Sequence, residues 1–293
     1  MIETHLSLLL VVIPLLAAPI TAILPNGRMP WLLTLLVSWV CFALAIWQYV
    51  MVVDGSVISY ELGGWTPPWG IEYRIDTVNA FVALIVAGMA AITMPYAMLS
   101  VEKEIPKEKL SLFYATFLLC MDGLLGITLT GDIFNLFVFL EISSLSTYAL
   151  ISMGRQRRAL TAAYQYLIMG TIGATFLLIG IGLIYAETGT LNMMDLSALL
   201  PSVFEHRTVH TAFAFIVVGV GLKLAMFPLH LWLPNAYTYS PSAVTVFLAA
   251  TATKVAVYVM LRLVFTVFSI GFAYVTPTDG MFMLVGALGV IVA

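Results

Sequence analysis

Apolar runs of about 20 residues recur along the whole chain and are separated by short polar segments. A helix of about 20 apolar residues is long enough to cross the ~30 Å hydrocarbon layer of a membrane. The pattern therefore predicts an all-α polytopic membrane protein.

A ninth apolar run starts near residue 281 and reaches Ala293 after about 13 residues, too few to span. We expect either that the sequence is incomplete at its C-terminus or that another chain completes the fold. The predicted spans cover residues 6–24, 31–53, 78–100, 111–130, 133–153, 160–185, 209–233 and 242–268.

Two of the connecting segments have patterns of their own. Segment 54–77 carries Gly63-Gly64 and Pro67-Pro68 between aromatic and β-branched residues, which favours a short external hairpin. Segment 186–208 spaces its leucines and methionines as a short amphipathic helix at the membrane interface would.

Composition supports the membrane assignment. The chain is 62% hydrophobic and 9% charged, whereas a soluble domain carries about 25% charged residues. The net charge of −3 is too small to indicate a nucleic-acid partner. Cys41 and Cys120 fall inside predicted spans without metal or haem spacing, so we interpret both as packing residues. No Lys or Arg precedes the first run, which favours a retained span over a signal peptide.

Basic residues are distributed unevenly between the two sets of loops. By the positive-inside rule the richer set is cytoplasmic, which places the N-terminus on the extracytoplasmic side of the cell (inner) membrane. The richer set holds Arg28, Lys103, Lys107, Lys109, Arg155, Arg157 and Arg158, and the other holds Arg74 and Arg207, with Arg262 near the end of the eighth span.

Three ionisable residues lie deep inside apolar runs: Glu141, Lys223 and Lys254. Because a charge at membrane depth costs at least a few kcal/mol, such a residue indicates a functional site with a partner. Glu141 is ten residues past Gly131, about 15 Å deep at 1.5 Å per residue. A static ion pair is the structural alternative for this carboxylate.

Lys223 precedes a proline-interrupted segment that ends the seventh run. Pro228 and Pro234 break the helix, and broken helices line ion sites in many transporters. His230 lies within the break, where its imidazole either passes protons or is simply hydrogen-bonded. Lys254 is about twelve residues into the eighth span, so we expect it to face the bundle interior or a water chain. Glu141, Lys223 and Lys254 together predict a lateral acid–amine–amine proton path.

Other polar positions allow further interpretations. Asp122, in the fourth span, is either an entry-path carboxylate or the cap of a helix irregularity beside Gly123. Asp132 is expected to be the N-cap of the fifth helix. Gln165 begins the sixth span and is a candidate for holding cytoplasmic water. The sequence has no nucleotide loop, zinc motif, haem or iron–sulfur ligand spacing or nucleophile elbow, so we expect no cofactor and no metal.

Three motifs carry a resemblance to a known family: TGDIFNLFVFLE with Glu141, GLKLAMFPLHLWLPNAY with Lys223 and His230, and PSAVTVFLAATATKVAVYVMLR with Lys254. The chain resembles the proton-conducting antiporter-like membrane subunits of Mrp-type cation/proton antiporters, respiratory complex I and membrane-bound hydrogenases. Its fifth-span motif and the Trp232–Tyr237 motif are similar to those of the D-type Mrp subunits. The resemblance covers nearly the whole chain. Many relatives have a Lys where this chain has Gln165, and often an uncharged residue in place of Asp122.

The resemblance implies two inverted five-helix repeats, each with a broken helix, joined by a central charged axis. On this basis residues 1–110 form an N-terminal three-helix region, 111–270 the first five-helix repeat, and 271–293 the start of a truncated second repeat. It also implies other membrane subunits as partners, with protons and monovalent cations as the transported species.

Three functions remain open from the sequence. The first is a proton-conducting subunit of a Na⁺ or K⁺/proton antiporter, and the second is a pumping subunit of a complex I-like oxidoreductase or membrane-bound hydrogenase. The third is a non-conducting assembly scaffold. Under none of these hypotheses do we expect the chain to be an enzyme on its own.

Overall fold

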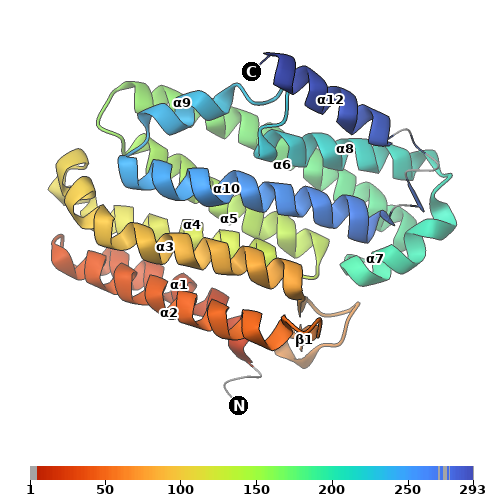
Figure 1. Ribbon diagram of the computed structural model, residues 1–293, viewed down its shortest axis with the longest axis horizontal. Coiled ribbons are helices and arrows are strands. Elements are labelled where there is room, and N and C mark those ends of the chain that lie inside the picture. The colour runs from red at the N-terminus through yellow and green to blue at the C-terminus, as the bar shows by residue number, and fades with distance from the viewer. Residues whose placement is uncertain (1–4, 270, 273–275, 277, 293) are drawn as a thin grey trace.

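The computed structural model describes residues 5–269, 271–272, 276 and 278–292 and consists almost entirely of long helices that run side by side (Figure 1). Within these described residues, eight helical segments are long and apolar enough to cross a membrane, as the sequence predicted. The helices are α1 (Leu6–Ile23), α2 (Arg28–Val52), α3 (Thr77–Glu104), α4 (Leu110–Leu129), α5 (Ile133–Ser152), α6 (Arg158–Thr188), α7 (Met193–Leu199), α8 (Arg207–Leu224), α9 (Trp232–Tyr239), α10 (Ser242–Leu261) and α12 (Thr278–Val292).

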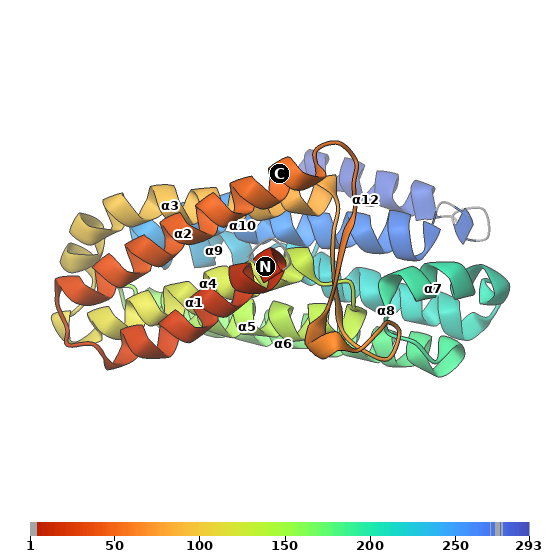
Figure 2. The same ribbon diagram turned by 90° about the horizontal axis from the view of Figure 1, so that it is seen from below.

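Helix α4 is the centre of the bundle. It packs against α1, α2, α3, α5 and α10, and 17 of its 20 residues are buried. Figure 2 shows α2 and α3 at one side of α4 and α5 and α6 along its other side, with α1 overlapping α4. A helix that is apolar all round is expected in such a position, because every face of it contacts protein.

The turns divide the bundle into two ends, visible at opposite sides of Figure 1. At what we call the hairpin end, strands β1 (Ile58–Glu61) and β2 (Glu72–Ile75) pair antiparallel, which confirms the predicted hairpin. Helix α7 lies at the same end, followed by a 3₁₀ turn over Leu200–Val203, in the segment predicted to hold a short helix. The opposite end, called the basic end, carries Arg28 and the loops that follow α3 and α5.

Close helix packing depends on small residues at a few positions. Helices α6 and α8 approach so closely that a Cβ added at Gly219 would lie 2.7 Å from the carbonyl oxygen of Gly173. A Cβ added at Gly180 would lie 2.6 Å from Ile216. Without a hydrophobic force between helices in lipid, such close backbone contact is the main source of helix association.

The predicted seventh span, 209–233, is not one continuous helix. Helix α8 ends at Leu224, and α9 begins at Trp232 after an irregular segment. Pro228 explains the end point, because a proline has no N–H for the carbonyl four residues earlier and its ring clashes with that carbonyl. Ala225 then turns the chain with φ 58, a left-handed conformation rare for a residue with a side chain. The predicted broken helix is therefore confirmed, with its break starting directly after Lys223 and Leu224.

The predicted eighth span also ends irregularly. Helix α10 passes into a π-helical turn over Arg262–Val267. The apolar run near residue 281 forms α12, which lines a cavity together with residues of α8.

Candidate functional site

Lys223 and Glu141 form an ion pair inside the bundle. Lys223 Nζ donates to Glu141 Oε1 at 3.3 Å, to Ser144 Oγ at 2.6 Å and to Tyr148 Oη at 3.4 Å. The lysine side chain is 5% exposed and the glutamate side chain 27% exposed. The pair therefore joins a buried amine to a carboxylate at the edge of the helix bundle.

One face of α5 supplies all three of these partners. Positions 141, 144 and 148 are separated by three and four residues, so their side chains line one stripe of a helix. Asp132 starts α5 by accepting a hydrogen bond from Asn135 N at 2.7 Å, which confirms the predicted N-cap. Burial raises the pKa of Asp132, and the backbone N–H groups of Asn135 and Phe134 partly offset this. This cap fixes the start of α5 and hence the depth at which Glu141 lies.

The end of α8 holds the amine in place. Lys223 lies in the last turn of α8, where the helix dipole favours a positive charge. The indole Nε1 of Trp232 donates to the carbonyl of Leu222 at 2.9 Å and so caps a backbone group released by the break. The break therefore positions an ammonium beside carbonyls that have left the regular helical pattern and are bonded by Trp232 and by the N–H groups of the turn.

Aromatic rings form a wall beside the amine. Tyr166 stacks on Trp232 with ring centroids 3.9 Å apart, and Tyr148 meets Tyr166 edge to face at 4.7 Å. Gly170 makes room for this wall, since a Cβ there would lie 1.8 Å from the Tyr148 hydroxyl. The sequence alone did not identify Ser144, Tyr148 or Trp232 as partners of the lysine or of its helix end.

A small cavity extends from Lys223 toward α10. Its volume is about 30 Å³, and a cavity needs about 10–15 Å³ to hold a water molecule. The cavity has polar groups for a water to bind, namely the amine and the hydroxyls of Ser143, Ser144 and Thr147. The space next to the ion pair is therefore large and polar enough for water.

Lys254 is not brought to the ion pair. Its side chain is exposed, whereas the sequence predicted that it faces the interior. Its Nζ donates to the carbonyl of Ala249 and to Thr253 Oγ1, both on its own helix. Ala252, Val255 and Ala256 of α10 face the cavity instead. The rotation of α10 about its axis therefore turns the lysine away from Lys223.

His230 and Gln165 lie at or near the break but outside the ion pair. The His230 ring stacks on Phe227 with centroids 5.7 Å apart, and its buried Nδ1 has no hydrogen-bond partner among the described residues. Gln165 is exposed, and its Oε1 accepts from Asn235 Nδ2 of α9 at 2.9 Å. Gln165 and Asn235 border a hollow of about 340 Å³ at the basic end. Tyr166, the next residue along α6, faces the Lys223 cavity.

Asp122 is fully buried in α4, which is regular on both sides of it, so it does not cap a helix irregularity. It also lies away from the ion pair. Gly123 faces α5, where an added Cβ would lie 2.6 Å from Ser143 N, and Leu124 and Ile127 line the Lys223 cavity. At 100° per residue, Asp122 is on the opposite face of α4 from Leu124 and Ile127.

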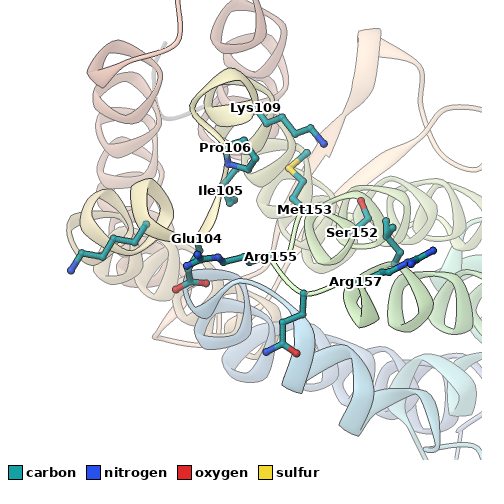
Figure 3. A pocket seen from close by; sticks show the side chains of 12 residues that line it. Glu104, Ile105, Pro106, Lys109, Ser152, Met153, Arg155 and Arg157 are labelled. Carbon is teal, nitrogen blue, oxygen red and sulfur yellow. The ribbon is translucent and has the colours of Figure 1, made fainter.

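A second, larger cavity lies at the basic end and is mainly cationic. It has a volume of about 550 Å³ and lies between the ends of α3, α4, α5 and α6 (Figure 3). Lys103, Lys109, Arg155 and Arg157 line it, and none of them forms an ion pair with a described residue. Its one carboxylate, Glu104, accepts hydrogen bonds from Ser100 Oγ and from Ser242 N. The excess of positive charge makes this end of the bundle distinct from the other.

Comparison with known proteins gives consistent matches. Residues 130–293 match the family described as NADH:quinone oxidoreductase/Mrp antiporter, TM. The chain is 44% identical over 266 residues to the N subunit of NADH-quinone oxidoreductase from Desulforudis audaxviator, covering 90% of this chain and 53% of that protein. It is 32% identical over 215 residues to the D subunit of the Na(+)/H(+) antiporter from Bacillus subtilis, covering 73% of this chain and 43% of that one.

A solved structure is similar over nearly the whole chain. A chain of the membrane-bound sulfane sulfur reductase, an archaeal respiratory membrane complex, superposes with a TM-score of 0.86 at 32% identity, covering 94% of this chain and 56% of that one. The chain thus spans about half the length of the proteins that it matches.

Proposed function

Because the chain belongs to the NADH:quinone oxidoreductase/Mrp antiporter transmembrane family, we propose that it is a membrane subunit that conducts protons for monovalent cation/proton antiport within a multisubunit complex. The observation that carries this proposal is the ion pair between Lys223 and Glu141 at the end of a broken helix. A buried ion pair contributes little to stability on balance, so its presence at membrane depth favours a functional role.

The geometry supports proton transfer between the two side chains. At 3.3 Å, the Lys223 ammonium can give a proton to the Glu141 carboxylate, which leaves two neutral groups. Two neutral groups cost much less free energy in a low-dielectric environment than two separated charges. The proton transfer from Lys223 to Glu141 therefore does not carry a prohibitive free-energy cost. Ser144 and Tyr148 stay hydrogen-bonded to the nitrogen in either state, because hydroxyls both donate and accept.

Access to the pair is proposed from two directions. The partly exposed Glu141 exchanges protons at the edge of the bundle, and the cavity on the other side of Lys223 takes water. The hollow bordered by Gln165 and Asn235 is separated from that cavity by the aromatic wall, so movement of Tyr166 would open a route from the basic end. His230 has a ring nitrogen without a partner among the described residues and lies in the break, so it is proposed to relay protons on this route.

Lys254 is proposed to transfer protons to a group that lies outside the described helices. Its amine is exposed on α10, at the height of the membrane interior, and bonds only neutral groups of its own helix among the described residues, so in lipid its charge requires a further partner. A further membrane segment or subunit against this face of α10 would give it a polar partner. In the same way, residues 111–270 are proposed to form one five-helix repeat, and α12 to begin a second.

The basic end is proposed to be cytoplasmic. The four cations around the Figure 3 cavity, which form no ion pair with described residues, fit the positive-inside rule, and the hairpin end with the N-terminus is then extracytoplasmic. This orientation is tested by placing single cysteines in the 54–77 and 153–158 loops and labelling them with a membrane-impermeant reagent. Reaction of the second loop alone in intact cells would contradict it.

A second candidate function is a proton-pumping subunit of a redox-driven complex. The 44% identity to a protein named as an NADH-quinone oxidoreductase subunit specifically favours it. The same ion pair would act in both cases, so the discriminating measurement is on the complex. Proton movement driven by a Na⁺ or K⁺ gradient, with no electron donor added, supports antiport, whereas movement only during electron transfer supports the redox complex.

The third hypothesis, a non-conducting scaffold, is tested with Glu141→Ala, Lys223→Ala and Lys254→Ala in the natural complex. We expect all three variants to assemble and to lose cation-dependent proton movement. Wild-type transport from all three would leave only the scaffold role.

A further inference from the structure

A second buried carboxylate lies apart from the ion pair. Asp122 is 0% exposed, and neither of its carboxylate oxygens has a hydrogen-bond partner among the described residues. It forms none of the ion pairs found in this part of the chain. An isolated buried carboxylate costs several kcal/mol, so in the working protein this one must be neutralised by a proton or by another cation.

The side chain points into the N-terminal half of the bundle. Asp122 lies on the face of α4 opposite to the Lys223 cavity, and the N-terminal elements that pack against α4 are α1, α2, α3 and β2. Tyr73 of β2 forms a β-bridge with Thr130, directly after α4, and burial raises the pKa of its hydroxyl. Cys41 is on the buried face of α2, which packs against α4. The site therefore lies between α1, α2 and α4, near the hairpin end.

A second unpartnered oxygen lies in the same layer. Gln48 of α2 is 1% exposed, and its Oε1 has no donor among the described residues, while its Nε2 donates to Ser7 Oγ of α1 at 2.9 Å. Gln48 is four residues from the hairpin end of α2 and Asp122 seven from that of α4, which corresponds to depths of about 6 Å and about 10 Å. Gln48 and Cys41 lie on the same buried face of α2, two turns apart, and so bracket the depth of Asp122.

Helix α1 supplies a free backbone oxygen at a similar depth. Pro14 lies inside α1 on its buried side and has no N–H, so the carbonyl of Leu10 lacks its usual donor. Leu10 is four residues from the start of α1, about 6 Å below the hairpin end. Carbonyls freed from helical hydrogen bonds in membrane proteins are used to coordinate monovalent cations.

The buried residues described for the elements around Asp122 include no cation. Among the described residues of α1 none is titratable, and the buried face of α2 contributes only Cys41. The hairpin contributes Tyr73 and the buried Glu72, which is paired with Arg74. The buried residues of α3 include no titratable group, and Glu141 on α5 is on the far side of α4. Carboxylate, amide and carbonyl oxygens without nitrogen or sulfur ligands are the set that hard cations prefer.

We propose that Asp122, Gln48 Oε1 and the Leu10 carbonyl form a second ion site, at which a proton and a Na⁺ ion compete for the Asp122 carboxylate. This inference rests on the proposed antiport function and deepens it, because competition of two cations for one carboxylate is what exchange requires. It places the cation site in the N-terminal helices, on the other side of α4 from the Glu141–Lys223 pair.

The test is ²²Na⁺ binding to the purified natural complex, with wild type, Asp122→Asn and, as a matched control, Glu141→Gln. We expect Na⁺ bound by the wild type to fall as the pH is lowered, Asp122→Asn to lose this pH-dependent binding, and Glu141→Gln to keep it. The control loses a carboxylate that is paired with Lys223, so its loss of transport with intact Na⁺ binding would separate the two sites. Equal binding by wild type and Asp122→Asn overturns the site.

Gln48→Met gives a second route if Asp122→Asn does not assemble. It keeps the carboxylate and the side-chain volume but removes one oxygen ligand, so we expect about a tenfold weaker Na⁺ affinity. Unchanged affinity in this variant overturns the ligand set. Proton movement that fails in Glu141→Gln while Na⁺ still binds supports both proposals. Transport that persists in Glu141→Gln contradicts only the proposed role of the ion pair.

Discussion

Replacing Glu141 by Gln removes the one negative charge among the described residues that contacts Lys223, and it changes the shape of the side chain little. The carboxylate oxygen lies 3.3 Å from Nζ, and two unit charges at that distance attract by about 5 kcal/mol for an effective dielectric constant of about 20. Ser144 and Tyr148 remain to hold the nitrogen, but as neutral hydroxyls they replace only part of that attraction. Each 1.4 kcal/mol corresponds to a factor of ten, so a third of the lost attraction is enough for about a tenfold effect on proton transfer.

We expect Glu141→Gln to reduce cation-dependent proton movement at least about tenfold, to the background of the assay. Glu141→Asp is expected to retain part of it, since it keeps a titratable carboxylate one methylene further from the amine. The assay is quenching of a pH-sensitive dye in everted vesicles after a Na⁺ or K⁺ pulse, normalised to the amount of assembled complex.

Ser146→Ala is the matched control on the same helix. Its hydroxyl bonds the carbonyl of Ile142 within α5 and does not contact Lys223, so transport should be unchanged. Equal activity of the Gln and Asp variants, or an equal loss in the Ser146 control, would refute the reasoning that a charge at this position moves the proton.

Two further predictions concern the frame around the pair. Gly170→Ala forces the Tyr148 hydroxyl away from Lys223, because the new Cβ would lie 1.8 Å from it, and we expect about a tenfold loss of proton movement. Gly182→Ala, whose Cβ would meet nothing within 4 Å, should leave transport intact, and a similar loss in both variants would contradict the steric argument. Ala225→Gly relieves the strain of the left-handed conformation at φ 58 and should stabilise the protein by about 0.5–1 kcal/mol. The measurement is the melting temperature of the purified complex, which should rise. A lower melting temperature would contradict the assignment of strain to this residue.

The number and place of the helices followed from the sequence because span length is set by membrane thickness. Runs of apolar residues located all eight long helices, and Pro228 located the break. Glycine and proline punctuation likewise located the hairpin between α2 and α3. These features depend only on the types of residues that are neighbours along the chain, and these can be read directly from the sequence.

The rotation of each helix about its axis could not be predicted from the sequence in the same way. Helix α4 is apolar around its circumference apart from Asp122, so nothing in its pattern says which face that residue occupies. Lys254 was expected inside and is exposed, because the small residues around it pack equally well on either side of α10. Membrane helices lack the polar outer face that fixes rotation in soluble proteins.

Part of the missed site was nevertheless readable. Glu141, Ser144 and Tyr148 are spaced by three and four residues, which places them on one helix face and marks Ser144 and Tyr148 as candidate partners of whatever Glu141 binds. The contribution of Trp232 was not readable, since its bond to the Leu222 carbonyl depends on the path of the break.

The coupling between Glu141 and Lys223 is the central claim, and a double-mutant cycle measures it most directly. Proton movement is compared in Glu141→Gln, Lys223→Gln and the double variant, each in the natural complex. If the two residues act as one unit, the double variant should be no worse than either single variant, because the second change removes nothing that the first left working. Losses that multiply, so that the double variant falls by the product of the two single effects, would show that the residues act independently and would contradict the account.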